Sequence, residues 1–378
     1  MTADAAAPSP SPAAPPAQAK ARPHYEQLDA LRALAVTAVV ISHYVPRGRF
    51  LGADPLGEAA AFAVHVFFAL SGLLITGILL DTRTKVDGGT TTFWGALGRF
   101  HARRVLRLFP IYFLVLGLCW AAGVLAMRDH PVSLLTFTYN NFLIGQGYFD
   151  GFVGHLWSLS VEQQFYLVWP FLMLLAPRRW LAPIAVATMG VAEAAKYYYL
   201  HADPTGMGYY VATVSCADEF AGGALVAMAA RAAGLPSVVR AWLHPTTTAI
   251  TLAGIVTGPW WSAVLPPQFG YANFVLYDVV ATTAVAGMLW GAMRGYGGRL
   301  GAVLSCRPAA RVAAVSYGLY VYHPLLPPLV GAALAAAGGP GANIVLTRAP
   351  IALALSVGLS MLSWEIFEKP INELKRYF

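Results

Sequence analysis

Long apolar stretches recur along the whole chain, and they limit its fold more than any other feature. Each stretch is about 20 residues long, which is enough for a helix to cross a hydrocarbon layer of about 30 Å. Because helices satisfy their own backbone polar groups within lipid, we expect an all-α, polytopic membrane helix bundle of about ten transmembrane helices. The predicted helices are residues 28–46, 59–80, 108–127, 157–176, 181–200, 210–230, 246–265, 271–293, 312–334 and 346–367.

The composition agrees with a membrane protein. Of the 378 residues, 57% are hydrophobic and only 11% are charged, whereas a soluble domain is about 25% charged. A chain with so few charged residues cannot cover a water-facing exterior, so the lipid bilayer is an expected partner. In a soluble protein the net charge of +7 would suggest nucleic acid. Here Lys and Arg in cytoplasmic loops explain it, and we expect no nucleic-acid partner.

The distribution of basic residues predicts the orientation of the chain. Most Lys and Arg residues fall in one set of alternate loops, which includes 99–107, 178–179 and 369–376. By the positive-inside rule these loops face the cytoplasm, as do both termini. We therefore expect an integral, multi-pass protein of the plasma (cytoplasmic) membrane.

Three parts of the chain are distinguished by composition. Residues 1–24 are rich in Ala and Pro and are predicted to be a disordered tail, because they cannot bury a core. Residues 25–370 contain all the apolar stretches and form the predicted transmembrane domain, and residues 371–378 are a predicted cytoplasmic tail. We expect no metal and no permanently bound cofactor, since no nucleotide or zinc motif is present and the three cysteines lie far apart, at Cys119, Cys216 and Cys306.

The first predicted helix carries two functional candidates, Arg32 and His43. Eleven positions apart, they share one helix face and are separated by about 16 Å along the axis. Ionisable residues are costly inside a membrane and indicate a functional site there. The alternative is an arginine that reaches the headgroups and a histidine at the other end of the helix. The first helix alone favours neither interpretation.

A cationic segment precedes the third predicted helix, with four arginines in nine residues. In helical form it presents a dense cationic face, suited either to a phosphate ligand or to anchoring against anionic lipid. Both interpretations remain open for Arg99, Arg103, Arg104 and Arg107.

The fourth predicted helix carries Ser158, Glu162 and Tyr166 on one face, because they are spaced four residues apart. Glu162 lies where a carboxylate can orient or deprotonate His43. The alternative is an acidic residue that interacts favourably with the positive end of the helix dipole.

Other polar residues in the apolar stretches are less informative. Ser71 and Gly72 form a small-residue patch where another helix can approach closely. We interpret His65 as a helix-end residue, and the alternative is a partner for His43. The remaining ionisable residues either pair with one another or line a cavity; they are Glu193, Lys196, Asp218 and Glu219.

Five motifs in order resemble the acyltransferase-3 family of integral membrane O-acyltransferases, over nearly the whole span from Leu28 to Pro370. Arg32 and His43 match the family's Arg-ten residues-His pattern, and Phe67–Gly72 matches its FFxLSG stretch. The other matches are Arg104 with Arg107 (Arg-x-x-Arg), Trp157–Tyr166 (WSLSVEEQFY), and Ser316-Tyr317 with Tyr320 and His323 (SYxxYLxH). Gln163 stands where the family usually has a second Glu, which argues against a carboxylate pair. Ala33 replaces a common Gly. The sequence ends soon after the last apolar stretch, so we expect no appended esterase-like domain.

The resemblance implies that an acyl group, with acetyl preferred, moves from acyl-CoA to a hydroxyl of a sugar, glycan or glycosylated metabolite. His43 would act as general base with Glu162 as its partner, and a covalent acyl-histidine is the other route. The residues expected to bind substrate are Arg32, Arg99, Arg103, Arg104, Arg107, Ser71, Trp157, Ser158, Tyr166, Tyr320 and His323. The rival hypothesis is a proton-coupled membrane transporter that uses the same His, Arg and Glu residues as a relay.

Overall fold

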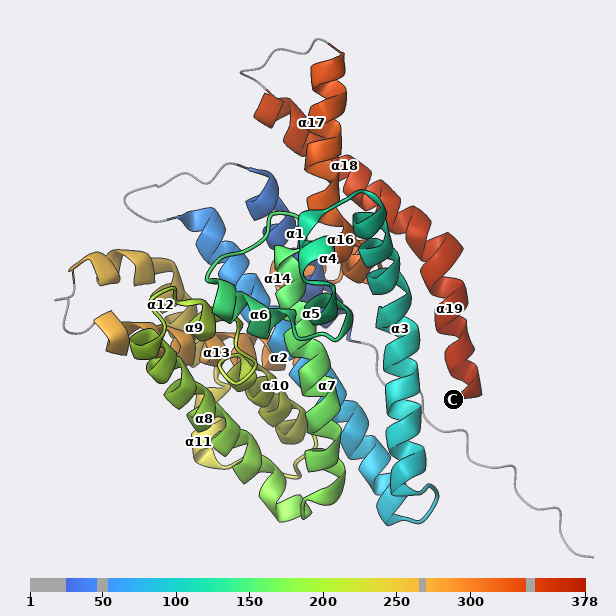
Figure 1. Ribbon diagram of the computed structural model, residues 1–378. Helices are drawn as coiled ribbons and strands as arrows, with labels where there is room; N and C mark the ends of the chain where they lie inside the picture. Colours follow the sequence, from blue (N-terminus) through green and yellow to red (C-terminus); the bar gives the residue numbers. More distant parts are fainter. Residues whose placement is uncertain (1–24, 46–53, 265–269, 338–343) are drawn as a thin grey trace, which may run out of the picture.

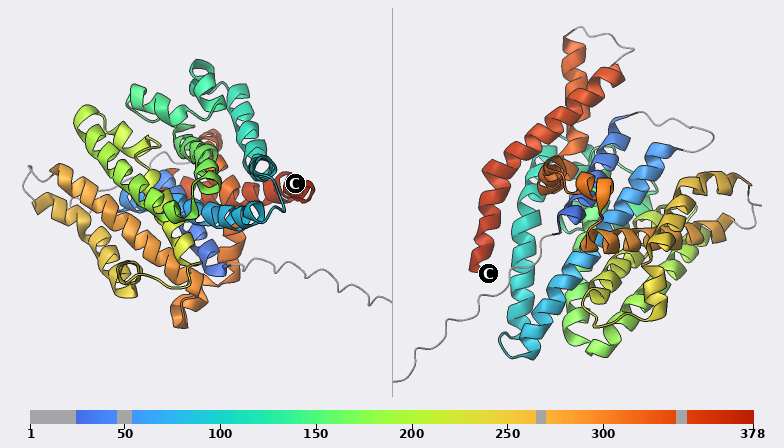
Figure 2. Two further views of the ribbon diagram at one scale, coloured as in Figure 1. Left: turned by 90° about the horizontal axis from the view of Figure 1, so that it is seen from below. Right: turned by 180° about the vertical axis from the view of Figure 1, so that it is seen from behind.

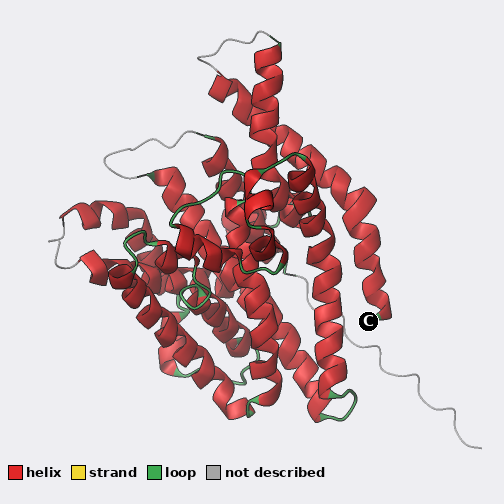
Figure 3. Cartoon of the chain, in the orientation of Figure 1, coloured by secondary structure: helices red, strands yellow, loops and turns green. Residues whose placement is uncertain are grey.

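The computed structural model describes residues 25–45, 54–264, 270–337 and 344–378. Over these ranges the chain is helical and contains no strand (Figures 1 and 3). The helices are α1 (Glu26–Tyr44), α2 (Pro55–Asp87), α3 (Phe93–Ala121), α4 (Leu125–Asp129), α5 (Pro131–Leu135), α6 (Tyr139–Gln146), α7 (Trp157–Leu175), α8 (Leu181–Ala202), α9 (Met207–Val211), α10 (Ala217–Ala229), α11 (Ser237–Trp242), α12 (Pro245–Val264), α13 (Gly270–Arg294), α14 (Gly298–Leu304), α15 (Arg307–Ala314), α16 (Ser316–Tyr322), α17 (Leu326–Ala336), α18 (Ile344–Ser363) and α19 (Lys369–Glu373).

Five helical stretches are long and apolar enough to cross a membrane, among the residues that the structure describes. This supports a multi-pass membrane protein. Every apolar stretch of the sequence overlaps at least one helix, but the number of ten spans and the cytoplasmic location of the termini stay predictions. The five stretches are Pro55–Asp87, Phe93–Ala121, Val275–Arg294, Ser316–Ala336 and Thr347–Tyr377.

The third predicted helix begins much earlier than the sequence suggested. α3 starts after Thr92, whose side chain accepts a hydrogen bond from the Gly95 N–H at 3.1 Å. It ends just before Gly123, which has a φ of 75° that favours glycine. The arginine segment 99–107 is therefore an integral part of this long helix. Its side chains can face the bundle as well as the solvent.

The sixth predicted helix is interrupted in the structure. Residues 212–216 separate α9 from α10 and do not form a helix. The Asn140 side-chain amide stabilises the break, because it donates to the Val211 carbonyl at 3.1 Å and to the Thr213 hydroxyl at 3.0 Å. Non-helical backbone at membrane depth is tolerated where it is buried in protein or lines a cavity.

The C-terminal residues extend the last helix. A π-helical turn, Trp364–Glu368, links α18 to α19, and the chain stays helical to Tyr377. The predicted tail 371–378 therefore includes the end of this helix, and α19 packs against α3. The Ala/Pro-rich tail 1–24 lies outside the described residues, so its predicted disorder stays a prediction.

Helix α2 organises the bundle. It packs against α1, α7, α10 and α13, and Figure 2 shows it passing through the middle of the helices. Its contact with α10 is the closest, because glycines meet backbone there. A Cβ on Gly72 would collide with the Phe220 carbonyl, and a Cβ on Gly223 would collide with the Ala69 carbonyl. The predicted small-residue patch at Ser71 and Gly72 is confirmed as a site of close helix approach.

We expect Gly223→Ala to destabilise the bundle by about 1–3 kcal/mol, because the added methyl group overpacks a backbone contact. The measurement is thermal unfolding of the purified protein in detergent. Gly98→Ala on α3 is the matched control, since its Cβ would meet nothing within 4 Å. Equal melting temperatures for the two variants would contradict the close contact between α2 and α10.

Candidate active site

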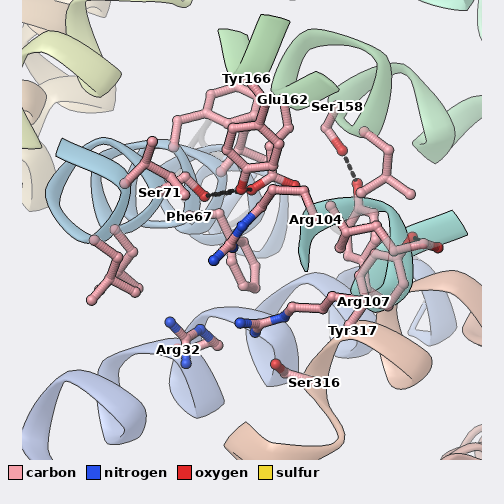
Figure 4. A pocket seen from close by; sticks show the side chains of 18 residues that line it. Arg32, Phe67, Ser71, Arg104, Arg107, Ser158, Glu162, Tyr166, Ser316 and Tyr317 are labelled. Atoms are coloured by element: carbon pink, nitrogen blue, oxygen red, sulfur yellow. Dashed lines mark hydrogen bonds between the residues drawn. The ribbon is translucent and has the colours of Figure 1, made fainter. Parts of the chain in front are cut away.

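Three arginines line one cavity, which we call the arginine pocket. Its volume is about 110 Å³, and α1, α2, α3, α7 and α16 contribute to its walls. Figure 4 shows Arg32, Arg104 and Arg107 pointing toward the same space. The other polar residues of its lining are Ser71, Ser158, Glu162, Tyr166, Ser316, Tyr317 and Tyr320.

The arginine pocket carries an excess of positive charge. Arg32 pairs with Asp29 at 2.9 Å, and Arg104 lies 5.8 Å from the centre of the Tyr166 ring. The buried Arg104 Nε has no hydrogen-bond partner among the described residues. Three guanidinium groups face one carboxylate of the lining, Glu162. Such a cavity favours an anionic ligand, and guanidinium groups suit phosphate oxygens particularly well.

Glu162 is held by neighbouring hydroxyl groups. Both the Ser71 hydroxyl and the Tyr166 hydroxyl donate to Glu162 Oε1, as the stick view in Figure 4 shows. This carboxylate therefore belongs to the arginine pocket. The contact predicted between Glu162 and His43 stays a prediction: the two residues line different cavities, and His43 Nδ1 lies 2.8 Å from His323 Nε2.

His43 lines a second and larger cavity, which we call the histidine pocket. Its volume is about 730 Å³. The ends of α1 and α2, the segment 149–157 and the turn after α16 surround it. His155 and Trp157 also line it, and such a cavity is large enough for a small-molecule substrate.

A chain of hydrogen bonds determines the tautomer of His43. His323 Nδ1 lies 2.7 Å from the Tyr320 carbonyl, which can only accept, so this nitrogen carries the proton. In the neutral ring, His323 Nε2 is then an acceptor. It lies 2.8 Å from His43 Nδ1, so His43 donates from Nδ1. In a neutral His43 ring Nε2 is then the unprotonated nitrogen, which is the form that a general base requires.

The two pockets share a wall. Val64 and Tyr320 line both of them. The Tyr320 hydroxyl lies 2.5 Å from the Ser158 hydroxyl and donates to the His155 carbonyl at 2.8 Å. These bonds hold the Tyr320 side chain in the wall that the two pockets share.

The structure brings most of the predicted site residues together, but not all of them. Arg99 and Arg103 are exposed on α3 and line neither pocket. The reason is helical geometry: Arg103 is about 100° around the helix from Arg104. Trp157 lines the histidine pocket. His323 contacts His43, which lines the same pocket.

Two features of the site were not predicted from the sequence. His155 lines the histidine pocket, and its ring contacts His323 with 5.1 Å between centroids. It lies in the 3-10 turn Gly154–Leu156 that precedes α7, so the helical spacing of Glu162 gave no signal for it. His65 is also not a helix-end residue, because α2 begins at Pro55 and the His65 Nδ1 lies 2.6 Å from Glu219 Oε1. In the described part of the chain no group of ligands suited to a metal ion is found.

A family model described as an acyltransferase domain (Acyl_transf_3) matches residues 25–365. The chain belongs to this acyltransferase family. The resemblance seen in the five motifs is thereby confirmed, and membership does not favour the rival hypothesis of a transporter.

Relatives in this family are named as O-acetyltransferases. The chain is 26% identical over 374 residues to the putative peptidoglycan O-acetyltransferase YrhL of Bacillus subtilis, covering 91% of this chain and 54% of that protein. It is 32% identical over 170 residues to the peptidoglycan O-acetyltransferase OatA of Listeria monocytogenes, covering 40% of this chain and 25% of that protein. The chain thus spans about half the length of the first and a quarter of the second. No solved structure matches it significantly.

Proposed function

We propose that the protein is a plasma-membrane O-acetyltransferase that moves an acetyl group from acetyl-CoA to a hydroxyl of a sugar or glycan. The observation that supports this most strongly is the pairing of two pockets. A cationic cavity suited to phosphates shares a wall with a cavity that contains an imidazole in the basic tautomer. The peptidoglycan O-acetyltransferases among the relatives make a glycan the preferred acceptor class.

In this proposal the arginine pocket binds the donor. Arg32, Arg104 and Arg107 contact phosphate oxygens of coenzyme A, and its thin pantetheine arm carries the thioester toward Tyr320. Glu162 keeps its contacts with Ser71 and Tyr166 and balances part of the cationic charge. It acts as a positioning residue.

The histidine pocket performs the transfer. His43 Nε2 takes the proton of the acceptor hydroxyl while the hydroxyl oxygen attacks the thioester carbonyl. The C–S bond then breaks, coenzyme A leaves as thiolate, and the imidazolium returns its proton to the sulfur. Such general base catalysis contributes about 10²- to 10⁴-fold in rate.

His323 is the proposed positioning residue for this base. We expect His323→Leu to lower kcat by about 10²-fold, because His43 loses the acceptor that fixes its tautomer. The KM for acetyl-CoA should stay unchanged, since the arginine pocket is untouched. His323→Gln supplies an amide oxygen as acceptor and should recover part of the rate. Equal losses in both variants, or a raised KM, would indicate a merely structural role.

Incubation of membranes containing the protein with labelled acetyl-CoA and a sugar acceptor tests the function. Mass spectrometry of the acceptor then shows whether a labelled acetyl ester has formed. A transporter would leave the acceptor unlabelled.

A further inference from the structure

A third cavity lies beside the histidine pocket, and neither the donor nor the base occupies it. We call it the acidic pocket. Its volume is about 250 Å³, and α2, α8, α9, α10 and α13 contribute most of its lining. It shares walls with the histidine pocket at Glu58, Ala61, Val64, Trp157 and Tyr210. A ligand in the acidic pocket therefore lies next to the cavity that contains His43.

Carboxylates outnumber basic groups in and around this cavity. The buried Lys196 Nζ lies 2.8 Å from Asp218 Oδ2 and 3.4 Å from Asp278 Oδ2. His65 pairs with Glu219. The carboxylates are Glu58, Glu219 and Asp278 in the lining, with Glu193 and Asp218 directly behind Lys196. The excess of negative charge disfavours an anionic ligand.

Glu219 is bonded to two neighbours in this cluster. It lines the cavity and is only 4% exposed, its Oε1 pairs with His65, and its carboxyl group also hydrogen-bonds that of Asp218. Two carboxyl groups share a hydrogen bond only through a proton, so this wall of the cavity contains a hydrogen-bond donor as well as acceptors. The interrupted backbone before α10 reaches the same cavity through Ser215 and Cys216. Non-helical backbone of this kind lines cavities in membrane proteins.

Aromatic rings form much of the remaining wall. Trp157 stands between the acidic and histidine pockets, and its ring lies 5.1 Å from that of Tyr210. Tyr277 and Phe68 also line the acidic pocket. Flat apolar surfaces beside hydrogen-bond acceptors fit a ring that has C–H faces and hydroxyl edges.

We propose that the acidic pocket binds a hydroxyl-rich, non-anionic sugar ring of the acceptor and thereby places a nearby hydroxyl at His43. The carboxylates accept hydrogen bonds from sugar hydroxyls, and Trp157 and Tyr277 contact the ring faces. This inference rests on the proposed function, and it names the acceptor class of that function more closely: neutral sugars are preferred over sugars that carry a carboxylate.

The test is equilibrium binding to the protein purified in detergent, so that it does not depend on acetyl transfer. The probes are methyl β-D-glucoside and methyl β-D-glucuronide, which differ by one carboxylate. We expect a saturable rise in melting temperature with the glucoside, and an apparent Kd at least about tenfold higher for the glucuronide. Equal binding of the two probes, or no change in melting temperature with the glucoside, would overturn the proposal. This test needs only the wild-type protein.

Variants then locate the binding site. Glu219→Gln should raise the Kd for the glucoside by about tenfold, because the amide replaces the carboxyl group that meets the sugar and disturbs its bond with Asp218. Tyr277→Leu is the second variant, in case Glu219→Gln does not fold, because it removes a ring face that contacts the sugar. Glu365→Gln is the matched control, since Glu365 is exposed and pairs with Lys369 at 3.0 Å. Unchanged binding in a folded Glu219→Gln or Tyr277→Leu protein would overturn the site.

The outcome separates this inference from the proposed function. If the glucoside binds in a Glu219-dependent manner and acetyl-CoA labels no acceptor, the function fails and the sugar site stands. If acetyl-CoA labels a sugar in a His43-dependent manner while Glu219→Gln leaves the Kd for the glucoside unchanged, the function stands and the sugar site fails.

Discussion

His43→Ala lowers the rate of acetyl transfer by about 10²- to 10⁴-fold, which is the contribution of a lost general base. The variant should remain folded, because His43 lies at the end of α1 and lines a cavity. The measurement is the initial rate of transfer from labelled acetyl-CoA in membranes with matched amounts of protein. His201→Ala on the exposed side of α8 is the control and should keep the wild-type rate.

Donor binding provides an internal check on this expectation. The rise in melting temperature with coenzyme A should be the same in wild type and in His43→Ala, since the donor phosphates bind in the arginine pocket. A His43→Ala protein that transfers acetyl at the wild-type rate would remove His43 from the mechanism.

The double variant Arg104→Gln/Arg107→Gln should raise the KM for acetyl-CoA by about 10²-fold or more. Each charge-assisted hydrogen bond contributes about 1.5–3 kcal/mol, and 1.4 kcal/mol corresponds to a factor of ten. The same α3 helix offers a matched control, Arg99→Gln/Arg103→Gln. It removes the same charge from the exposed positions and should leave the KM unchanged.

The comparison also decides between the two interpretations of the arginine segment. Both double variants could instead lower expression, or reverse the orientation of the chain in the membrane, to the same extent and with an unchanged KM. The arginines would then determine membrane orientation and would not bind the donor.

Local sequence patterns predicted the parts of the site that depend on a single helix. Arg32 and His43 lie eleven residues apart, and the structure directs both into cavities of the bundle. Ser158, Glu162 and Tyr166 likewise face one pocket because their spacing is helical. Gly72 was recognisable as a site of close approach, since a small residue in an apolar helix has few other structural uses.

Contacts between distant segments could not be read in this way. Helical spacing places Glu162 beside Tyr166 on one face of α7 but does not fix its height relative to His43, so the contact with the Ser71 hydroxyl of α2 was missed. The partner of His43 is His323, which is 280 positions away. The acidic pocket depends on Lys196 meeting Asp218 and Asp278 from different helices. Such pairings arise from tertiary packing, which hydrophobic periodicity does not specify.

The central claim is that an acetyl group passes from coenzyme A to a sugar hydroxyl with His43 as the base. Mass spectrometry of a neutral sugar acceptor after incubation with carbon-13-labelled acetyl-CoA tests it most directly, in membranes containing either wild type or His43→Ala. We expect a labelled sugar ester with the wild type and at most about a hundredth as much with the variant. A sugar that stays unlabelled with the wild type, or one that is labelled equally by both proteins, would contradict the account.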